Sequence, residues 1–322
     1  MIHDRYFTNL SFNLFMPISV LYFLIAHLVF LLLKPFPTLR LHEEQLREEY
    51  CFSTDISSCI NNIDSRVDKN QRNVAIVTGS NTGIGKETAL SLVERGYDVI
   101  LACRSREKGE QAAQEINLKV QQGKSITSSV LTRTQSSRFG SAMFIHPLDL
   151  SSFESVRSFV KSFQGKYSVL NILVNNAGIN STGKSNNGMD LCFQTNFVSH
   201  FLLTSLLIPN LLKARNVYRF QKRNDAILTS ETDKFEAGRI VNVSSVTHHF
   251  SPVDHKNGTN DQTRAGNSGM HDEFWWKECM KPGVSNNTYK ESKLAAIVFT
   301  YELNKRLAQH GIKAISVNPG AV

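Results

Sequence analysis

The sequence predicts an α/β fold in which a parallel, doubly wound sheet follows an N-terminal transmembrane helix. Short runs rich in β-branched residues alternate with amphipathic stretches from residue 73 onward, which is the pattern of βαβ units. A glycine-rich turn follows the first of these runs, and an apolar run without charged residues stands near the N-terminus. Together these observations indicate a Rossmann-type sheet with a membrane anchor.

Composition limits the class of protein. The 322 residues, of which 41% are hydrophobic, suffice for one large core without a second full domain. The net charge of +8 comes from cations scattered among acidic neighbours, which argues against nucleic acid and suits anionic ligands or a membrane surface. The 5 cysteines are odd in number and form no CxxC pair, so we expect reduced thiols, no disulfide framework and no metal site.

A short flank, residues 1–13, leads into an apolar run, residues 14–33, that contains no Asp, Glu, Lys or Arg. As a helix this run would span ~30 Å, the thickness of the hydrocarbon core of a bilayer. A cleaved signal peptide is the alternative, but its apolar run is usually only ~7–15 residues long and ends at a small-x-small site, which is missing here. We therefore expect an uncleaved single-pass anchor.

The charges that flank the anchor predict its orientation. Arg5 precedes it, whereas Lys34, Arg40 and Arg47 follow it. By the positive-inside rule the large domain lies in the cytosol, at the endoplasmic reticulum or a related organelle. Residues 34–72 are charged and polar without a sustained apolar period and are expected to form a juxtamembrane spacer.

The folded domain is predicted to cover residues 73–322. Strands are expected at Val74–Val77, Val99–Ala102, Ala142–Ile145, Ile172–Val174, Ile240–Val243 and Ala314–Val317. Helices are expected at Lys86–Arg95, Glu107–Lys119, Phe153–Phe163, Met189–Leu212 and Tyr289–Gln309. Three polar stretches are expected to be surface insertions, since compact folds seldom hold long structureless loops: residues 121–141, 214–237 and 251–287.

The glycine-rich turn lies between the first strand and the first helix of the domain and comprises Gly79, Ser80, Asn81, Thr82, Gly83, Ile84 and Gly85. Glycines permit a tight turn and a close approach to the backbone, and the helix N-terminus adds free N–H groups and a positive dipole end. At the head of a βαβ unit this arrangement predicts a site for a dinucleotide pyrophosphate. A glycine-rich turn without a ligand is the alternative.

Further motifs follow in a set order: Leu148-Asp149-Leu150, Asn175-Asn176-Ala177-Gly178, Asn196, Ser244-Ser245, and Tyr289 with Lys293. With the TGxxxGIG turn they resemble the short-chain dehydrogenase/reductase family over nearly all of residues 73–322. The resemblance implies a nicotinamide dinucleotide bound by the glycine-rich turn. It also implies cofactor contacts at Asp149, Leu150, Asn176, Ala177, Gly178, Tyr289, Lys293, Pro319 and Gly320.

Four residues carry the chemistry that this resemblance implies. Tyr289 gives or takes a hydroxyl proton while hydride moves between the substrate carbon and the nicotinamide. Lys293 lies four residues later, so both side chains share one helix face and the ammonium favours the phenolate. Ser245, rather than its neighbour Ser244, matches the position that holds the substrate oxygen. Asn196 matches the position that orders a water beside the lysine.

The end of the second strand predicts which cofactor is used. A carboxylate there would accept the ribose hydroxyls of NAD and repel the additional phosphate of NADP. Here the residues are Ala102-Cys103-Arg104-Ser105, and the planar donor fork of Arg104 suits a phosphate. We therefore expect NADP rather than NAD, with Arg106 and Lys108 as weaker helpers.

The residues around the motifs are similar to the retinol dehydrogenase-like branch of the family. These are residues 81–89, 101–105 and 243–249. This similarity implies a membrane-anchored oxidoreductase acting on a lipophilic alcohol or carbonyl that is retinoid-, steroid- or lipid-like, and a homo-oligomer is possible. Side chains that could line its pocket are His248, His249, Trp275 and Trp276, although an ordinary loop with partly buried aromatics is the simpler interpretation.

Two departures from the family are expected to matter. The segment between Ser245 and Tyr289 is long, so it must fold aside for the two side chains to meet, at little entropic cost. The sequence stops at Val322, just after the sixth strand, where family members continue through a substrate-covering loop and a seventh strand. An impaired product that only binds or scaffolds, or a fragmentary gene model, is therefore the alternative to an active enzyme.

Overall fold

The computed structural model describes residues 72–127, 139–224, 238–251, 279–282 and 288–320. All of them belong to one compact unit, which comprises Tyr50–Gly258 and Cys279–Val322. The expected flank, the transmembrane anchor and all of the spacer except Arg72 lie outside the described residues, as do Trp275 and Trp276.

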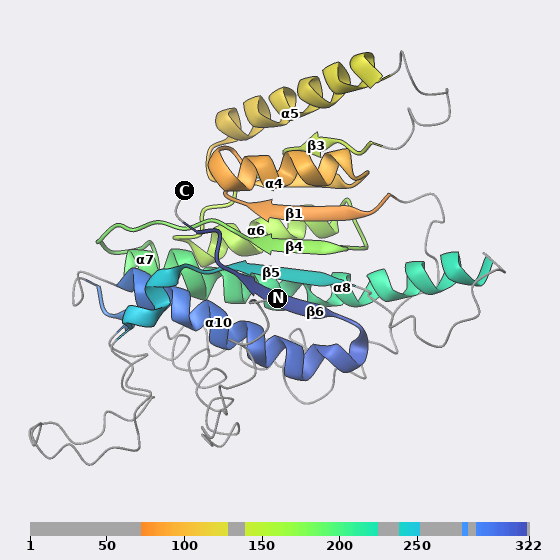
Figure 1. Cartoon of the computed structure of the whole chain (residues 1–322). Coiled ribbons are helices and arrows are strands. Elements are labelled where there is room, and N and C mark those ends of the chain that lie inside the picture. The colour runs from red at the N-terminus through yellow and green to blue at the C-terminus, as the bar shows by residue number, and fades with distance from the viewer. Residues whose placement is uncertain (1–71, 128–138, 225–237, 252–278, 283–287, 321–322) are drawn as a thin grey trace, which may run out of the picture. The chain divides into compact units, whose positions relative to one another are not determined.

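Six parallel strands form one sheet in the order β3-β2-β1-β4-β5-β6 (Figure 1). The strands are β1 (Val74–Thr78), β2 (Asp98–Ala102), β3 (Ala142–Met143), β4 (Ile172–Asn175), β5 (Arg239–Val243) and β6 (Lys313–Val317). Every residue of β1 is buried, as expected of a central strand covered on both faces. The order reverses between β1 and β4, and doubly wound sheets bind ligands in the crevice at such a reversal.

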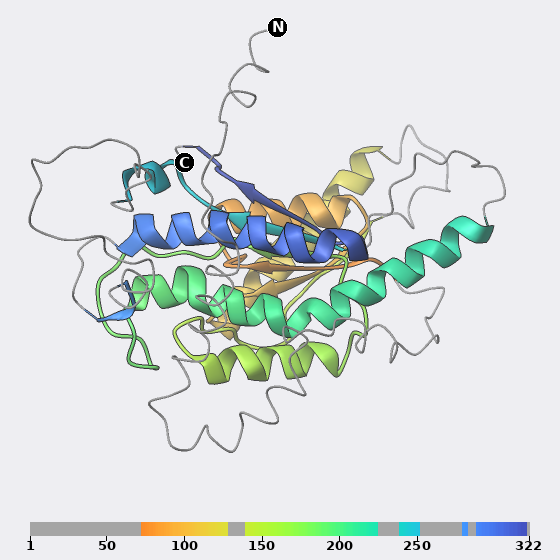
Figure 2. The ribbon, with the colours of Figure 1, turned by 90° about the horizontal axis from the view of Figure 1, so that it is seen from below.

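Helices cover both faces of the sheet. They are α4 (Gly83–Glu94), α5 (Arg106–Thr127), α6 (Phe153–Gln164), α7 (Leu191–Phe193), α8 (Ser199–Asn224) and α10 (Thr288–Leu307). A π-helical turn, η2 (Gln194–Val198), joins α7 to α8, and two 3-10 turns are η3 (Val246–Phe250) and η5 (Ala308–His310). α6, α8 and α10 lie side by side on one face (Figure 2), whereas α4 and α5 pack on each other and on β1 to β3 on the opposite face.

Helix α6 illustrates how the sequence specifies these elements. Ser152 caps its N-terminus by accepting a hydrogen bond from the backbone N–H of Ser155. Four of its apolar side chains recur at helical spacing and are buried: Val156, Phe159, Val160 and Phe163. One face of the helix therefore packs toward α8 while the opposite face remains polar.

The predicted α/β fold is confirmed, with differences in extent. β3 has only 2 residues, fewer than expected. The helix expected at residues 189–212 is instead interrupted by the π turn η2. α5 and α8 continue to Thr127 and Asn224, so the first parts of two expected insertions are helical, because the residues that extend α8 include no glycine or proline to end it.

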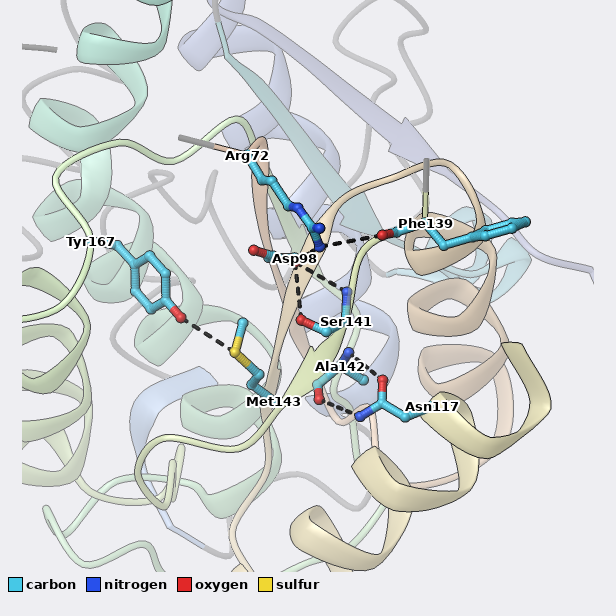
Figure 3. Close-up of polar contacts among 8 residues, drawn as sticks. All are labelled: Arg72, Asp98, Asn117, Phe139, Ser141, Ala142, Met143 and Tyr167. Atoms are coloured by element: carbon cyan, nitrogen blue, oxygen red, sulfur yellow. Dashed lines mark hydrogen bonds and ion pairs between the residues drawn. The ribbon is translucent and has the colours of Figure 1, made fainter. Parts of the chain in front are cut away.

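Both edges of the sheet are closed by an asparagine from a neighbouring helix. Asn117 of α5 accepts from the N–H and donates to the C=O of Ala142 in β3, both at 2.9 Å (Figure 3). Asn304 of α10 binds Ala314 of β6 in the same way, at 2.8 and 2.6 Å. We call these two contacts the edge brackets. Each occupies main-chain groups that an edge strand otherwise leaves open.

A second set of contacts secures β3 against β2. The Asp98 carboxylate accepts hydrogen bonds from the N–H and hydroxyl of Ser141, at 3.1 and 3.0 Å, and lies 3.6 Å from the Arg72 guanidinium (Figure 3). The Tyr167 hydroxyl lies 3.5 Å from the sulfur of Met143. This short strand is therefore held mainly by side-chain contacts.

Buried asparagines connect the sheet to the helices beneath it. Asn175 of β4 donates to Thr204 of α8 and to Asn242 of β5, at 2.9 and 2.8 Å. Asn242 in turn donates to Thr300 of α10 at 2.8 Å. Because a buried polar group must be paired, this ladder fixes α8 and α10 relative to the ends of β4 and β5.

The apolar character of the α7–α8 segment reflects its place in the core. Leu191–Ala214 is the one described segment long and apolar enough to cross a membrane, and 72% of its most apolar window is buried within the domain. The described cysteines, Cys103, Cys192 and Cys279, are free and buried. No cluster of potential metal ligands occurs among the described residues.

Candidate active site

The glycine-rich turn joins β1 to α4 at the point where the strand order reverses. Gly79 and Gly83 have positive φ values of 65° and 55°, a conformation that favours glycine. A Cβ at Gly85 would lie 2.4 Å from the carbonyl oxygen of Gly79. The chain therefore needs glycine at Gly79 and Gly83 for the turn and at Gly85 for close packing.

The N-terminus of α4 is left open by this turn. Thr82 stands at the N-cap position but makes no side-chain capping bond, and Thr82 and Gly83 are exposed. Exposed N–H groups at the positive end of a helix dipole suit a phosphate. Ser80, in contrast, is fully buried, and its hydroxyl donates a hydrogen bond to the carbonyl of Val77 at 2.8 Å. This bond stabilises the turn from the side that faces the core.

The residues beyond β2 and β3 form the expected adenosine side of the crevice. Arg104 is exposed at the end of β2. Arg106 is paired with Glu110 at 3.2 Å and lies over the Phe144 ring, which makes it less available than Arg104. The Asp149 carboxylate accepts from the N–H and hydroxyl of Ser151, at 2.9 and 2.8 Å, and Leu150 is buried.

The loop after β4 is held against the end of β1 by Thr78. The Thr78 hydroxyl accepts from the N–H groups of Asn176 and Ala177, both at 2.9 Å. The Asn176 side chain donates to the Thr78 carbonyl at 2.8 Å. Gly178 follows and is exposed; a Cβ there would lie 3.3 Å from the Lys293 ammonium nitrogen. Lys293 and the loop after β4 therefore meet at Gly178.

Tyr289 and Lys293 share one face near the start of α10. The Nζ atom of Lys293 lies 5.4 Å from the centre of the Tyr289 ring. Lys293 is only 4% exposed, and Nζ donates to the carbonyl of Val243 at 3.0 Å. Burial lowers the pKa of Lys293 to about 8. The sequence-predicted pair is thus together, with the lysine confined in a dry environment.

The serine pair after β5 divides into two roles. Ser244 is buried and donates to the main-chain carbonyl of Lys293 at 2.9 Å, so it anchors α10. Ser245 is partly exposed, and its side chain accepts from the N–H of Thr247 at 3.3 Å. η3, which begins immediately after Ser245, packs against α10. Most of the segment between Ser245 and Tyr289 lies outside the described residues, so its expected course stays a prediction.

The side chain of Asn196 binds the backbone on the far side of Gly178. Its oxygen accepts from the N–H of Ile179 at 2.8 Å, and its amide donates to the Ile179 carbonyl at 2.9 Å. The amide also reaches the hydroxyl of Ser292 at 3.0 Å. Asn196 thus links the loop after β4 to Ser292, the residue beside Lys293. Its expected role in ordering a water beside Lys293 stays a prediction.

The remaining predicted residues lie at the margins of this cluster. Pro319 and Gly320 are exposed beyond β6. His248 is partly buried, with Nδ1 2.5 Å from the Ser245 carbonyl, and His249 is exposed. The structure brings His248 next to Ser245, and a pocket lined by these histidines stays a prediction.

Several residues of the cluster were not singled out from the sequence. Cys192 lies 3.3 Å from the Asn196 amide, and burial raises the pKa of its thiol while the Lys293 charge opposes that rise. Asp190 accepts from Thr288, the first residue of α10, at 2.7 Å. His200 bonds to both Thr78 and Asn196. The available signal was helical spacing, since Cys192, Asn196 and His200 recur every four residues.

Comparison with known proteins identifies relatives of this chain. The short chain dehydrogenase family profile matches residues 73–217. Retinol dehydrogenase 11 of Mus musculus is 35% identical over 251 residues, which cover 77% of this chain and 61% of that protein. Dehydrogenase/reductase SDR family member 13 of Bos taurus is 34% identical over 248 residues, 77% of this chain and 51% of that protein. The chain thus spans less than two thirds of the length of these relatives.

A solved structure shares the fold. A short-chain dehydrogenase from Sphingobium yanoikuyae in complex with NADPH superposes with a TM-score of 0.50 at 17% identity, covering 77% of this chain and 71% of that one. At this identity the likeness concerns the parallel sheet and its helices alone.

Proposed function

We propose that this chain is an NADP-dependent oxidoreductase. It belongs to the short-chain dehydrogenase family and resembles the retinol dehydrogenases of that family. Its substrate would be a lipophilic alcohol or the corresponding carbonyl compound. The observation that carries the proposal is the convergence of Tyr289, buried Lys293 and the Asn196-bound loop at Gly178. This cluster stands beside an open glycine-rich turn that fits a pyrophosphate.

The bound nicotinamide would supply or accept hydride. Tyr289 would pass a proton to, or take it from, the substrate oxygen through its hydroxyl group. The Lys293 ammonium, near the Tyr289 ring, would stabilise the phenolate that forms when the proton leaves. Ser245 would donate a hydrogen bond to the same substrate oxygen as negative charge develops there.

The preference for NADP rests on charge at the end of β2. Arg104 is an exposed cation at the position where NAD-binding sheets carry a carboxylate. A guanidinium forms two parallel hydrogen bonds to a phosphate, and it binds a free ribose hydroxyl less strongly. Arg104 is therefore proposed to select the phosphorylated cofactor.

The proposal includes a membrane location. Residues 14–33 are long and apolar enough to anchor the chain, and the cations that follow them favour a cytosolic domain. A lipophilic substrate would then be met at the membrane surface. Protease treatment of intact vesicles tests the orientation: a fully protected domain would refute it.

The activity is tested with the full chain in membranes, supplied with NADPH and retinal, a steroid ketone or an aliphatic aldehyde. We expect turnover with NADPH, and a loss of about 100-fold or more in kcat for Tyr289→Phe. Tyr301→Phe is the matched control, because Tyr301 lies on the same helix but is 61% exposed. NADPH binding without turnover of any substrate would instead favour a non-catalytic binding protein.

A further inference from the structure

Histidine 200 lies in the first turn of α8, directly after the π turn that contains Asn196. It is 4% exposed, and both of its ring nitrogens have partners. Nδ1 lies 2.9 Å from the main-chain carbonyl of Asn196, and Nε2 lies 2.9 Å from the hydroxyl of Thr78. The ring therefore connects the end of β1 with the π turn. π turns are frequent at functional sites.

The hydrogen bonds around Thr78 determine where the ring carries its proton. The Thr78 hydroxyl already accepts from two backbone N–H groups, those of Asn176 and Ala177, so it is left to donate its own proton. His200 Nε2 is nearer to it, at 2.9 Å, than the Val174 carbonyl, at 3.4 Å. Nε2 is thus the acceptor, and Nδ1 carries the hydrogen that binds Asn196.

Both partners of this ring belong to the candidate site. Thr78 precedes Gly79 and holds the loop that leads to Gly178. Asn196 binds Ile179 and reaches Ser292, the neighbour of Lys293. A neutral ring with one donor and one acceptor satisfies both partners. In a doubly protonated ring, the hydrogen on Nε2 would point at the hydroxyl hydrogen of Thr78. Burial and the charge of Lys293 both disfavour a charged ring.

We propose that His200, as a neutral imidazole protonated on Nδ1, is a positioning residue. It orients Asn196 and connects Asn196 through Thr78 to the glycine-rich turn. This inference rests on the proposed dehydrogenase function. His200 touches neither substrate nor cofactor directly; it fixes the main chain of Asn196, whose side chain then bridges the Gly178 loop and the helix of Lys293.

Three substitutions separate the two halves of this contact in the full-length protein. His200→Asn retains a donor close to Nδ1, His200→Gln retains an acceptor close to Nε2, and His200→Leu removes both. We expect kcat to fall about 100-fold in the leucine variant, the typical cost of misplacing a catalytic group by ~1 Å. We expect the asparagine variant to recover most of kcat, and the glutamine variant to keep the KM for NADPH but not kcat.

A structural control and a double variant exclude a general packing effect. Asn210→Leu removes a buried polar side chain of the same helix, 3% exposed, that bonds to Ser168 far from the site; it should lower stability without altering kcat.

In an Asn196→Ala background, His200→Leu should lower kcat by no more than about twofold further. Equal kcat losses in the three His200 variants, or an additive double variant, would overturn the proposal.

A spectroscopic measurement does not depend on activity. In ¹⁵N-histidine-labelled full chain in detergent, the signal absent from His200→Asn should show a protonated Nδ1 and an unprotonated Nε2, unchanged between pH 8 and about 5. A ring protonated on Nε2, or charged near pH 6, would refute the inferred state. A wild type without turnover but with the expected ring state would overturn the proposed function and leave the positioning contact standing.

Discussion

The burial of Lys293 lowers the stability of the folded chain near neutral pH. Its ammonium is buried against Val243 and the Gly178 loop, and the loss of hydration lowers its pKa from 10.5 to about 8. The charged form is therefore disfavoured in the folded protein relative to the unfolded chain. A purely structural position would be filled better by an apolar side chain.

This burial predicts a pH dependence of stability. Between pH 8 and 10.5 the unfolded chain keeps the Lys293 proton that the folded chain has released, so the free energy of unfolding rises with pH, by up to about 1.4 kcal/mol per unit. Lys293→Met should be more stable near pH 7 and should lack this rise. Urea unfolding at pH 7.5 and 9.5 measures both effects. Lys305→Met, at an exposed position of the same helix, should behave as the wild type, and an unchanged slope in Lys293→Met would contradict the argument.

Arg104 predicts cofactor selectivity. Arg104→Glu should raise the KM for NADPH about tenfold or more and shift the preference toward NADH, because a carboxylate repels the phosphate and accepts ribose hydroxyls. Initial rates with both cofactors measure this. Lys119→Glu makes the same charge change on α5, where Lys119 pairs with Glu87, and should leave the ratio unaltered. If both variants reduce NADPH use equally, general electrostatics and not Arg104 sets the preference.

At the residue scale the sequence predicts groups whose chemistry has a set spacing. Tyr289 and Lys293 could be paired because four residues on a helix return to the same face. His200 could not be assigned, because its role depends on Thr78, a residue 122 positions away. Likewise, the contact of Ser244 with the Lys293 carbonyl could not be read from the sequence; it gives Ser244 a structural partner and supports the proposed assignment of the substrate contact to Ser245.

At the scale of elements, the edge brackets predict a measurable stability. Asn117→Ala should destabilise the protein by about 1–3 kcal/mol, because the N–H and C=O of Ala142 lose their partner. Urea unfolding measures the change. Gln111→Ala, which removes only an exposed bond to Glu115, should cost less than about 0.5 kcal/mol. Equal effects would show that β3 does not depend on the bracket.

The elements themselves were largely predictable, and their ends were not. Runs such as those of β1 and β2 carry enough aliphatic side chains to identify buried strands. β3 has only 2 residues and depends on Asn117 and Asp98 from other elements. The π turn at Gln194–Val198 has no local sequence signature, because it reflects the packing of Asn196 and His200 against distant segments.

At the scale of the whole molecule, the reversal of strand order between β1 and β4 predicts stabilisation by the proposed cofactor. NADPH should raise the unfolding free energy by about 2.7 kcal/mol at a concentration 100 times its Kd, since only the folded chain assembles the site. Thermal unfolding with and without NADPH measures this, and NADH at the same concentration should have a smaller effect.

Gly85→Ala should abolish this stabilisation, because a Cβ there would lie 2.4 Å from the Gly79 carbonyl. Gly165→Ala is the comparison: Gly165 ends α6 with a helical φ of −68°, and its Cβ would come no nearer than 3.4 Å to another atom, so the variant should keep the NADPH effect. If NADPH stabilised the Gly85 variant as much as the wild type, the glycine-rich turn would not be the binding site.

The edge brackets also bear on the order in which the chain folds. Asn117 and Ala142 are 25 positions apart, and Asn304 and Ala314 only 10, whereas the contact of Val74 with Asn171 beside the central strands spans 97. Short loops close sooner than long ones. Each border strand can therefore be covered by its own helix before β1 pairs with β4, so that a partly folded sheet containing β3 or β6 would not expose that border.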